Sequence, residues 1–124
     1  MLKRSFILSS LLIAGLGAGC GGGYSTGPSG PPVAGGPTTA LIPSGAYTGA
    51  QPSFAPPTLT VTAGTTVTFG NNDSTTHTTV ADGGQWNSGN LEPGRTFTVK
   101  LDTPGTYSYH CVIHPFMTGK IVVQ

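Results

Sequence analysis

The stretch at residues 58–69 reads TLTVTAGTTVTF and alternates threonine with apolar residues. Leu59 and Val61 alternate with threonines before Ala63-Gly64, and the alternation resumes from Thr66. Successive side chains of a β-strand point to opposite faces, so a period of two indicates a strand with one buried face. Small residues between two such runs are typical of a turn. The stretch therefore predicts two half-buried strands joined by a turn.

The same period of two returns further along the chain. Phe97, Val99 and Leu101 alternate with polar residues, as do Tyr107 and Tyr109, and a last short strand is expected over residues 120–123. Turn-forming residues separate these runs, at Asn71-Asn72-Asp73, Asp82-Gly83-Gly84, Glu92-Pro93-Gly94 and Thr103-Pro104-Gly105. No stretch has a convincing helical period. The sequence predicts an all-β protein, folded as a small Greek-key β-sandwich.

Composition narrows the class of protein. The chain has 124 residues, enough for one ordinary domain, and only 7% of them are charged. The formal net charge is +1 and lysine and arginine form no run, which excludes nucleic acid as a partner. The two cysteines, Cys20 and Cys111, are each expected to have a separate role, which leaves none for a disulfide.

The first 20 residues resemble a bacterial export signal. Lys3 and Arg4 precede an apolar stretch at residues 6–14, and small residues lead to Cys20. About ten apolar residues are too few to span a bilayer, which takes about 20. A cysteine at this place resembles a lipoprotein signal, in which the thiol is acylated; ordinary cleavage is the alternative. We expect a protein of the bacterial periplasm, anchored to a membrane through lipidated Cys20.

Residues 21–45 are expected to form a flexible linker, because this stretch is rich in glycine and proline and has no charged residue. The folded domain is then residues 46–124. An alternative is that Thr39 to Ala46 forms a first edge strand, since Ala40-Leu41-Ile42 is apolar and edge strands tolerate proline.

The segment at residues 109–120, YHCVIHPFMTGK, carries the chemistry. Cys111, His114 and Met117 recur every third residue as the chain leaves a strand. A thiolate and two imidazoles in a trigonal set, with a weak axial thioether, are the ligands of a blue copper centre. His77 is the candidate for the second imidazole. His110 is expected to point away from Cys111, because neighbouring residues of a strand face opposite ways.

These residues resemble a known family, the cupredoxins of plastocyanin and azurin type, most closely the amicyanin branch. The resemblance extends from about Phe54 to Gln124 and rests on several short elements: residues 63–67, 71–77, 86–89, 93–94 and 104–107, and the Cys111, His114 and Met117 loop. It implies one type 1 copper per chain, with His77, Cys111 and His114 as equatorial ligands and Met117 as axial ligand. Two residues separate His114 from Met117, as in amicyanin.

One position departs from the family pattern. Ile113 stands where amicyanin and plastocyanin have a proline just before the second histidine. We hypothesise that the Ile113 N–H donates a hydrogen bond to the Cys111 thiolate, beside one expected from the Thr78 backbone. Such bonds withdraw charge from sulfur and raise the reduction potential, so Ile113→Pro is expected to lower it.

The leading interpretation is an electron carrier and not an enzyme, because after the ligands are counted only His110 is left for a second copper site. Pro115 and Phe116 either pack or form an apolar rim around His114, where a redox partner such as a cytochrome c or an oxidoreductase would dock. We expect a monomer. The alternative function is a periplasmic copper-binding or copper-delivery protein, and zinc suits the same sulfur and nitrogen donors.

Overall fold

The structure is a computed structural model that describes residues 33, 35–49 and 52–124. The expected export signal and Cys20 lie outside the described residues. The described strands form two sheets, and the all-β prediction is confirmed. Their bounds are β1 Thr39–Ile42, β2 Thr58–Val61, β3 Thr65–Asn71, β4 Val80–Ala81, β5 Thr96–Leu101, β6 Gly105–His110 and β7 Thr118–Val123, with a 3-10 helix, η1, at Ala46–Thr48. Within this part of the chain no helix has the length and apolar character to cross a membrane.

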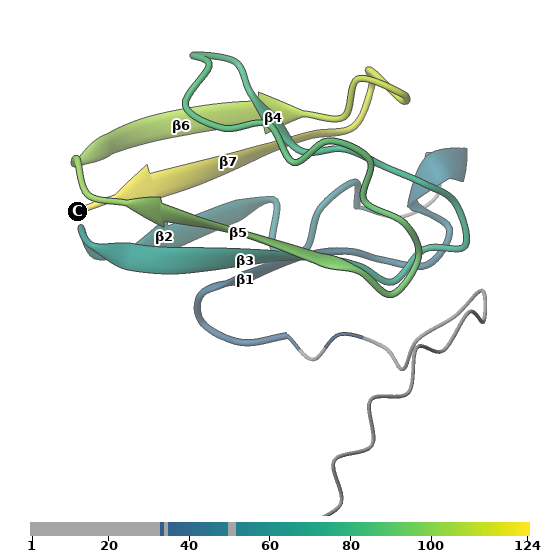
Figure 1. The fold of residues 1–124 in the computed structure, drawn as a ribbon, viewed down its shortest axis with the longest axis horizontal. Helices are drawn as coiled ribbons and strands as arrows, with labels where there is room; N and C mark the ends of the chain where they lie inside the picture. Colours follow the sequence, from purple (N-terminus) through teal and green to yellow (C-terminus); the bar gives the residue numbers. More distant parts are fainter. Residues whose placement is uncertain (1–32, 34, 50–51) are drawn as a thin grey trace, which may run out of the picture.

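The two sheets pack face to face, one with the order β1-β3-β5 and the other with the order β2-β7-β6-β4 (Figure 1). Threonine alternation sets the buried face of each strand: Leu59 and Val61 are buried in β2, and Val67 and Phe69 in β3, while Thr58 is exposed. The core combines aliphatic residues with an aromatic cluster, in which Phe54, Phe69, Trp86 and Tyr109 pack ring against ring.

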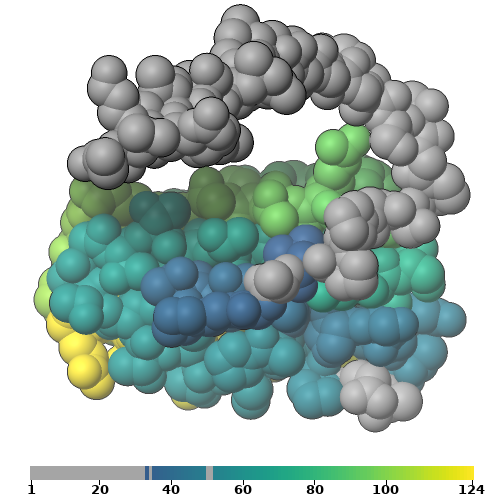
Figure 2. All heavy atoms as spheres, turned by 90° about the horizontal axis from the view of Figure 1, so that it is seen from below, coloured from purple at the N-terminus to yellow at the C-terminus, as the bar shows by residue number. Residues whose placement is uncertain are grey.

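The expected linker is replaced in part by a strand. Residues 39–42 form β1, which pairs in parallel with β3 in the register Thr39↔Thr68 to Ile42↔Asn71. Ala40 and Ile42 are fully buried, so this apolar run gains more by joining the sheet than by remaining in a flexible linker. Figure 2 shows β1 along the outside of its sheet, against the region of β3. The edge strand that was the alternative interpretation of Thr39 to Ala46 is thus present over residues 39–42, and these four residues are not part of a flexible linker.

Successive strands alternate between the two sheets from β1 to β6, and only β6 and β7 are consecutive neighbours in one sheet. The β3–β4 and β6–β7 connections reach the same end of the sandwich, on the right in Figure 1, where η1 also lies. The chain therefore brings residues 72–79 and 111–117 together at one end.

Candidate metal centre

The two connections at this end are held in place by backbone hydrogen bonds. His77 forms an isolated bridge with Leu91, in which the His77 N–H donates to Leu91 at 3.1 Å and the Leu91 N–H donates back at 2.8 Å. In the β6–β7 connection the Cys111 N–H donates to the Met117 carbonyl, and the Met117 N–H to the His114 carbonyl. The loop thus closes on itself, and the side chains of Cys111 and His114 lie close together.

Three donor atoms from the two connections lie within a few ångströms of each other. Cys111 Sγ is 3.8 Å from His77 Nδ1 and 3.9 Å from His114 Nδ1, and the two nitrogens are 3.1 Å apart. In the plane of this triangle, one point is about 2.1 Å from all three atoms, a distance suited to metal–nitrogen bonds of about 2.0 Å and metal–sulfur bonds of about 2.3 Å. His77, Cys111 and His114 therefore fit a single metal ion.

Met117 completes the group of residues that the sequence singled out. Its side chain is fully buried, and its backbone carbonyl accepts the hydrogen bond from Cys111. A thioether, a thiolate and two imidazoles are the donor set that suits copper, because soft sulfur favours Cu(I) and imidazole also suits Cu(II).

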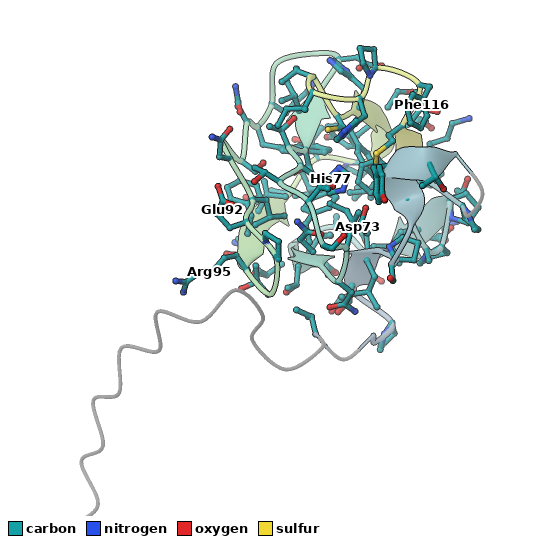
Figure 3. The ribbon with its side chains drawn as sticks, turned by 90° about the vertical axis from the view of Figure 1, so that its right-hand side faces the viewer. Asp73, His77, Glu92, Arg95 and Phe116 are labelled. Carbon is teal, nitrogen blue, oxygen red and sulfur yellow. The ribbon has the colours of Figure 1, made fainter. Side chains whose placement is uncertain are left out.

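Asp73 orients His77, a role that the sequence interpretation missed by taking it as a turn former. Asp73 Oδ2 is 2.9 Å from His77 Nε2, and both side chains are buried (Figure 3). A carboxylate whose pKa is low can only accept, so Nε2 carries the proton and Nδ1 is left with its lone pair toward Cys111. Because Asp73 and His77 lie in a connection between strands and not on a helix, their four-residue spacing gave no signal of this contact.

Several hydrogen bonds keep Asp73 ionised. Burial raises the pKa of this carboxyl, but hydrogen bonds from the Gly45 N–H, the His77 ring, the Ser74 N–H and the Tyr47 N–H outweigh it, so the pKa falls below its usual value. Burial lowers the pKa of His77, whereas its contacts with Cys111 and Asp73 raise it overall. The negative carboxylate and the polarised ring therefore stabilise each other.

The Cys111 thiol is prepared to act as a thiolate. It is fully buried, and the Thr78 N–H donates to Sγ at 3.3 Å, as expected. Burial raises the pKa of the thiol, but the contact with the His77 ring and the backbone N–H groups of Thr78 and His114 outweigh burial and lower it to about 5. Since the thiolate is the form that binds metals, Cys111 is already in its metal-binding form before an ion arrives.

Within the described residues, the Ile113 N–H forms no hydrogen bond with Cys111 Sγ, contrary to our expectation. The Val112 N–H donates instead to Thr78 Oγ1 at 2.9 Å, and the backbone N–H that lowers the thiol pKa from within the loop is that of His114.

His110 is separated from the metal ligands, as its place in the strand predicted. Its Nδ1 lies 2.6 Å from Asp82 Oδ1 on the outer face of the sheet, whereas Cys111 is in the core. It is therefore not positioned as a ligand of the same ion.

Large apolar side chains are exposed at the end of the sandwich that carries His114 (Figure 1). Tyr47, Val112, Ile113 and Phe116 are the large apolar side chains that are exposed in the described residues, with exposed fractions of 44 to 55%, and we call them the apolar rim. The Phe116 ring lies 6.1 Å from the His114 ring and close to Gly49, just after η1. Figure 3 places Phe116 on one side of His77, and Glu92 and Arg95 on the other. Pro115 is also exposed.

Comparison with known proteins agrees with this geometry. The family described as "Cupredoxin-like domain" matches residues 46–123. "Amicyanin-alpha" of Methylorubrum extorquens is 35% identical over 80 residues, which cover 60% of this chain and 67% of the relative. "Plastocyanin, chloroplastic" of Chlamydomonas reinhardtii is 40% identical over 98 residues, covering 68% of this chain and 67% of the relative.

One solved structure matches over most of its length. The "Novel Purple Cupredoxin from Nitrosopumilus maritimus" superimposes with a TM-score of 0.65 and 31% identity, covering 70% of this chain and 99% of that chain. The family match over residues 46–123 includes His77, Cys111, His114 and Met117.

Proposed function

The chain belongs to the cupredoxin-like family, and from that premise we propose that it is a blue-copper protein that carries single electrons between redox partners outside the cytoplasm. The observation that carries this function is the triangle of Cys111 Sγ, His77 Nδ1 and His114 Nδ1, which surrounds a point at bonding distance from all three. Copper bound there supplies a one-electron Cu(II)/Cu(I) couple.

The residues of this chain would each make a distinct contribution. His77, Cys111 and His114 would hold one copper ion, and the Met117 thioether would be a further, weaker ligand. Because the loop and the His77 bridge are tied by backbone hydrogen bonds, the donors would move little when the ion changes valence. A small rearrangement gives fast electron transfer. We propose that the protein is not an enzyme, because the role proposed for the site is the transfer of an electron without chemical change of a substrate.

We further propose that the carrier is exported by residues 1–20 and held at a membrane through lipidated Cys20. The support is the order of charged, apolar and small residues before that cysteine. The chain between residue 21 and β1, rich in glycine and proline, would then act as the tether.

The docking site that we propose for redox partners is the apolar rim together with Pro115. An electron would leave through the exposed edge of His114, because that ring connects the buried donors with the surface. A partner such as a cytochrome c or an oxidoreductase would meet few charges here, so the association rate should depend weakly on ionic strength. We expect the carrier to act as a monomer.

A test separates electron transfer from copper delivery, which is the alternative. The full chain loaded with Cu(II) is reduced and mixed with an oxidised cytochrome c, in the presence of a colorimetric Cu(I) chelator. We expect rapid oxidation by the cytochrome with copper retained over many cycles. Transfer of Cu(I) to the chelator on reduction, without cycling, would instead indicate a copper-delivery protein.

A further inference from the structure

Asp73 is set apart from the other acidic residues of the described chain by its burial. It is 3% exposed, whereas Asp82, Glu92 and Asp102 are exposed. It does not face the three metal donors directly, because its contact is with Nε2 of His77, on the far side of the ring from Nδ1. Any effect of Asp73 on a metal must therefore act through His77.

The four hydrogen bonds to this carboxylate come from two parts of the chain. Oδ1 accepts from the Gly45 N–H at 2.9 Å and from the Ser74 N–H at 2.8 Å. Oδ2 accepts from the Tyr47 N–H at 3.2 Å and faces the His77 ring at 2.9 Å. Each oxygen thus has one donor from the N-terminal segment that ends in η1, which leaves the carboxylate no freedom to rotate away from His77.

The N-terminal segment is itself anchored beside Asp73. The Asn72 side chain accepts from the Val33 N–H at 2.7 Å and donates to the Val33 carbonyl at 3.0 Å, and the Asn72 N–H donates to Ile42. Together with the pairing of β1 to β3, these contacts hold the segment before and after the strand. The N–H groups of Gly45 and Tyr47, which donate to Asp73, are therefore held in place.

We propose that Asp73 is a positioning residue for copper and that residues 39–48, which hold it, are part of the centre that sets the balance between Cu(II) and Cu(I). A carboxylate hydrogen-bonded to the outer nitrogen of a ligating imidazole fixes the tautomer of the ring and makes its other nitrogen a more basic metal ligand. A more basic nitrogen ligand and a nearby negative charge stabilise Cu(II) more than Cu(I). The proposal rests on the proposed electron-carrier function.

The first test replaces Asp73 by asparagine in the full chain. Asp73→Asn keeps the shape but removes the charge, so we expect the equilibrium to shift toward Cu(I) by about tenfold or more, which is a rise of about 59 mV in reduction potential. Rotation of the new amide would also turn an N–H₂ toward the backbone donors. A shift of the Cu(II)/Cu(I) equilibrium by less than about twofold from the parent, in a folded and copper-loaded variant, would overturn the proposal.

The second test loosens the segment without touching the carboxylate. Gly45 has a φ of 82°, a left-handed conformation that alanine resists, so Gly45→Ala should displace the N–H that Asp73 accepts. Gly84 has a φ of 80° and open space around it, which makes Gly84→Ala a matched control. We expect Gly45→Ala to raise the potential and Gly84→Ala to leave it unchanged; equal potentials would show that the segment has no such role.

A third readout needs no redox chemistry and separates this proposal from the function on which it rests. In the full chain loaded with Zn(II), nitrogen-15 NMR should detect a proton on His77 Nε2 that exchanges slowly with water, and Asp73→Asn should make that exchange at least about tenfold faster. A proton that exchanges quickly in the parent protein would refute the positioning role. Failure of copper cycling with slow exchange intact would refute only the electron-carrier function.

Discussion

Thr78 connects the thiolate with the loop that carries the other ligands, and its hydroxyl can be removed cleanly. Thr78 Oγ1 accepts the Val112 N–H at 2.9 Å and lies 3.8 Å from Cys111 Sγ, and the side chain is buried. Thr78→Val replaces the hydroxyl by a methyl group of similar size. The backbone N–H of Thr78, which donates to Sγ at 3.3 Å, is left in place.

The expected loss of stability follows from the one strong hydrogen bond that disappears. A typical intramolecular hydrogen bond contributes about 1 kcal/mol net, and Val112 is exposed enough for water to compensate for part of the lost partner. For a domain of this size about 1 kcal/mol corresponds to a fall of about 4–8 °C in Tm. The reduction potential should fall slightly, by less than about 59 mV, because the hydroxyl is a distant donor to sulfur.

The neighbouring threonine provides the control. Thr79 is fully buried, and within the described residues its Oγ1 has no hydrogen-bond partner. Thr79→Val removes an unsatisfied hydroxyl, so it should leave the Tm of the metal-free protein unchanged or raise it. Thermal unfolding of the metal-free full chain, followed by circular dichroism, compares the two variants. Equal Tm values for Thr78→Val and Thr79→Val, or a rise in potential for Thr78→Val, would refute the reasoning.

Three further predictions concern the loop and its surroundings. Ile113→Pro should change the reduction potential by less than about 59 mV in voltammetry, since the Ile113 N–H donates no hydrogen bond to sulfur; a larger fall would show that it does. Gly119→Ala should destabilise the metal-free protein by about 1–3 kcal/mol in urea unfolding, because its Cβ would meet the buried Tyr109 ring; an unchanged midpoint would show that the ring has room. Phe116→Ala should slow electron transfer to cytochrome c in stopped-flow measurements without moving the potential; an unchanged rate would place docking elsewhere.

The strands were predictable because their signal is local. Alternation of threonine with apolar residues assigns a buried face to β2, β3 and β5 without knowledge of the partner strand. The metal ligands of the loop were also predictable, since a cysteine, a histidine and a methionine at a spacing of three already define the types of ligand. His77 required the fold, because 34 residues separate it from Cys111.

Contacts made over long distances in the sequence were harder to predict. β1 is only four residues long and lies in a stretch rich in glycine and proline. Its structure depends on its pairing with β3, which the local composition does not reveal. Asp73 looked like a turn residue because its backbone donors, at Gly45 and Tyr47, are 28 and 26 residues away. The choice between the Ile113 and His114 N–H groups depends on how the loop turns after Cys111, which no pattern of residue types encodes.

The central claim is that Cys111 binds a copper ion that changes valence reversibly. The most direct measurement is the visible and electron paramagnetic resonance spectrum of the full chain with Cu(II), before and after a mild reductant and after reoxidation, with Cys111→Ser as control. We predict a strong thiolate-to-copper charge-transfer band that bleaches on reduction, returns on reoxidation and is absent from Cys111→Ser. A protein that binds copper or zinc but stays colourless, or bleaches without recovery, would contradict the account.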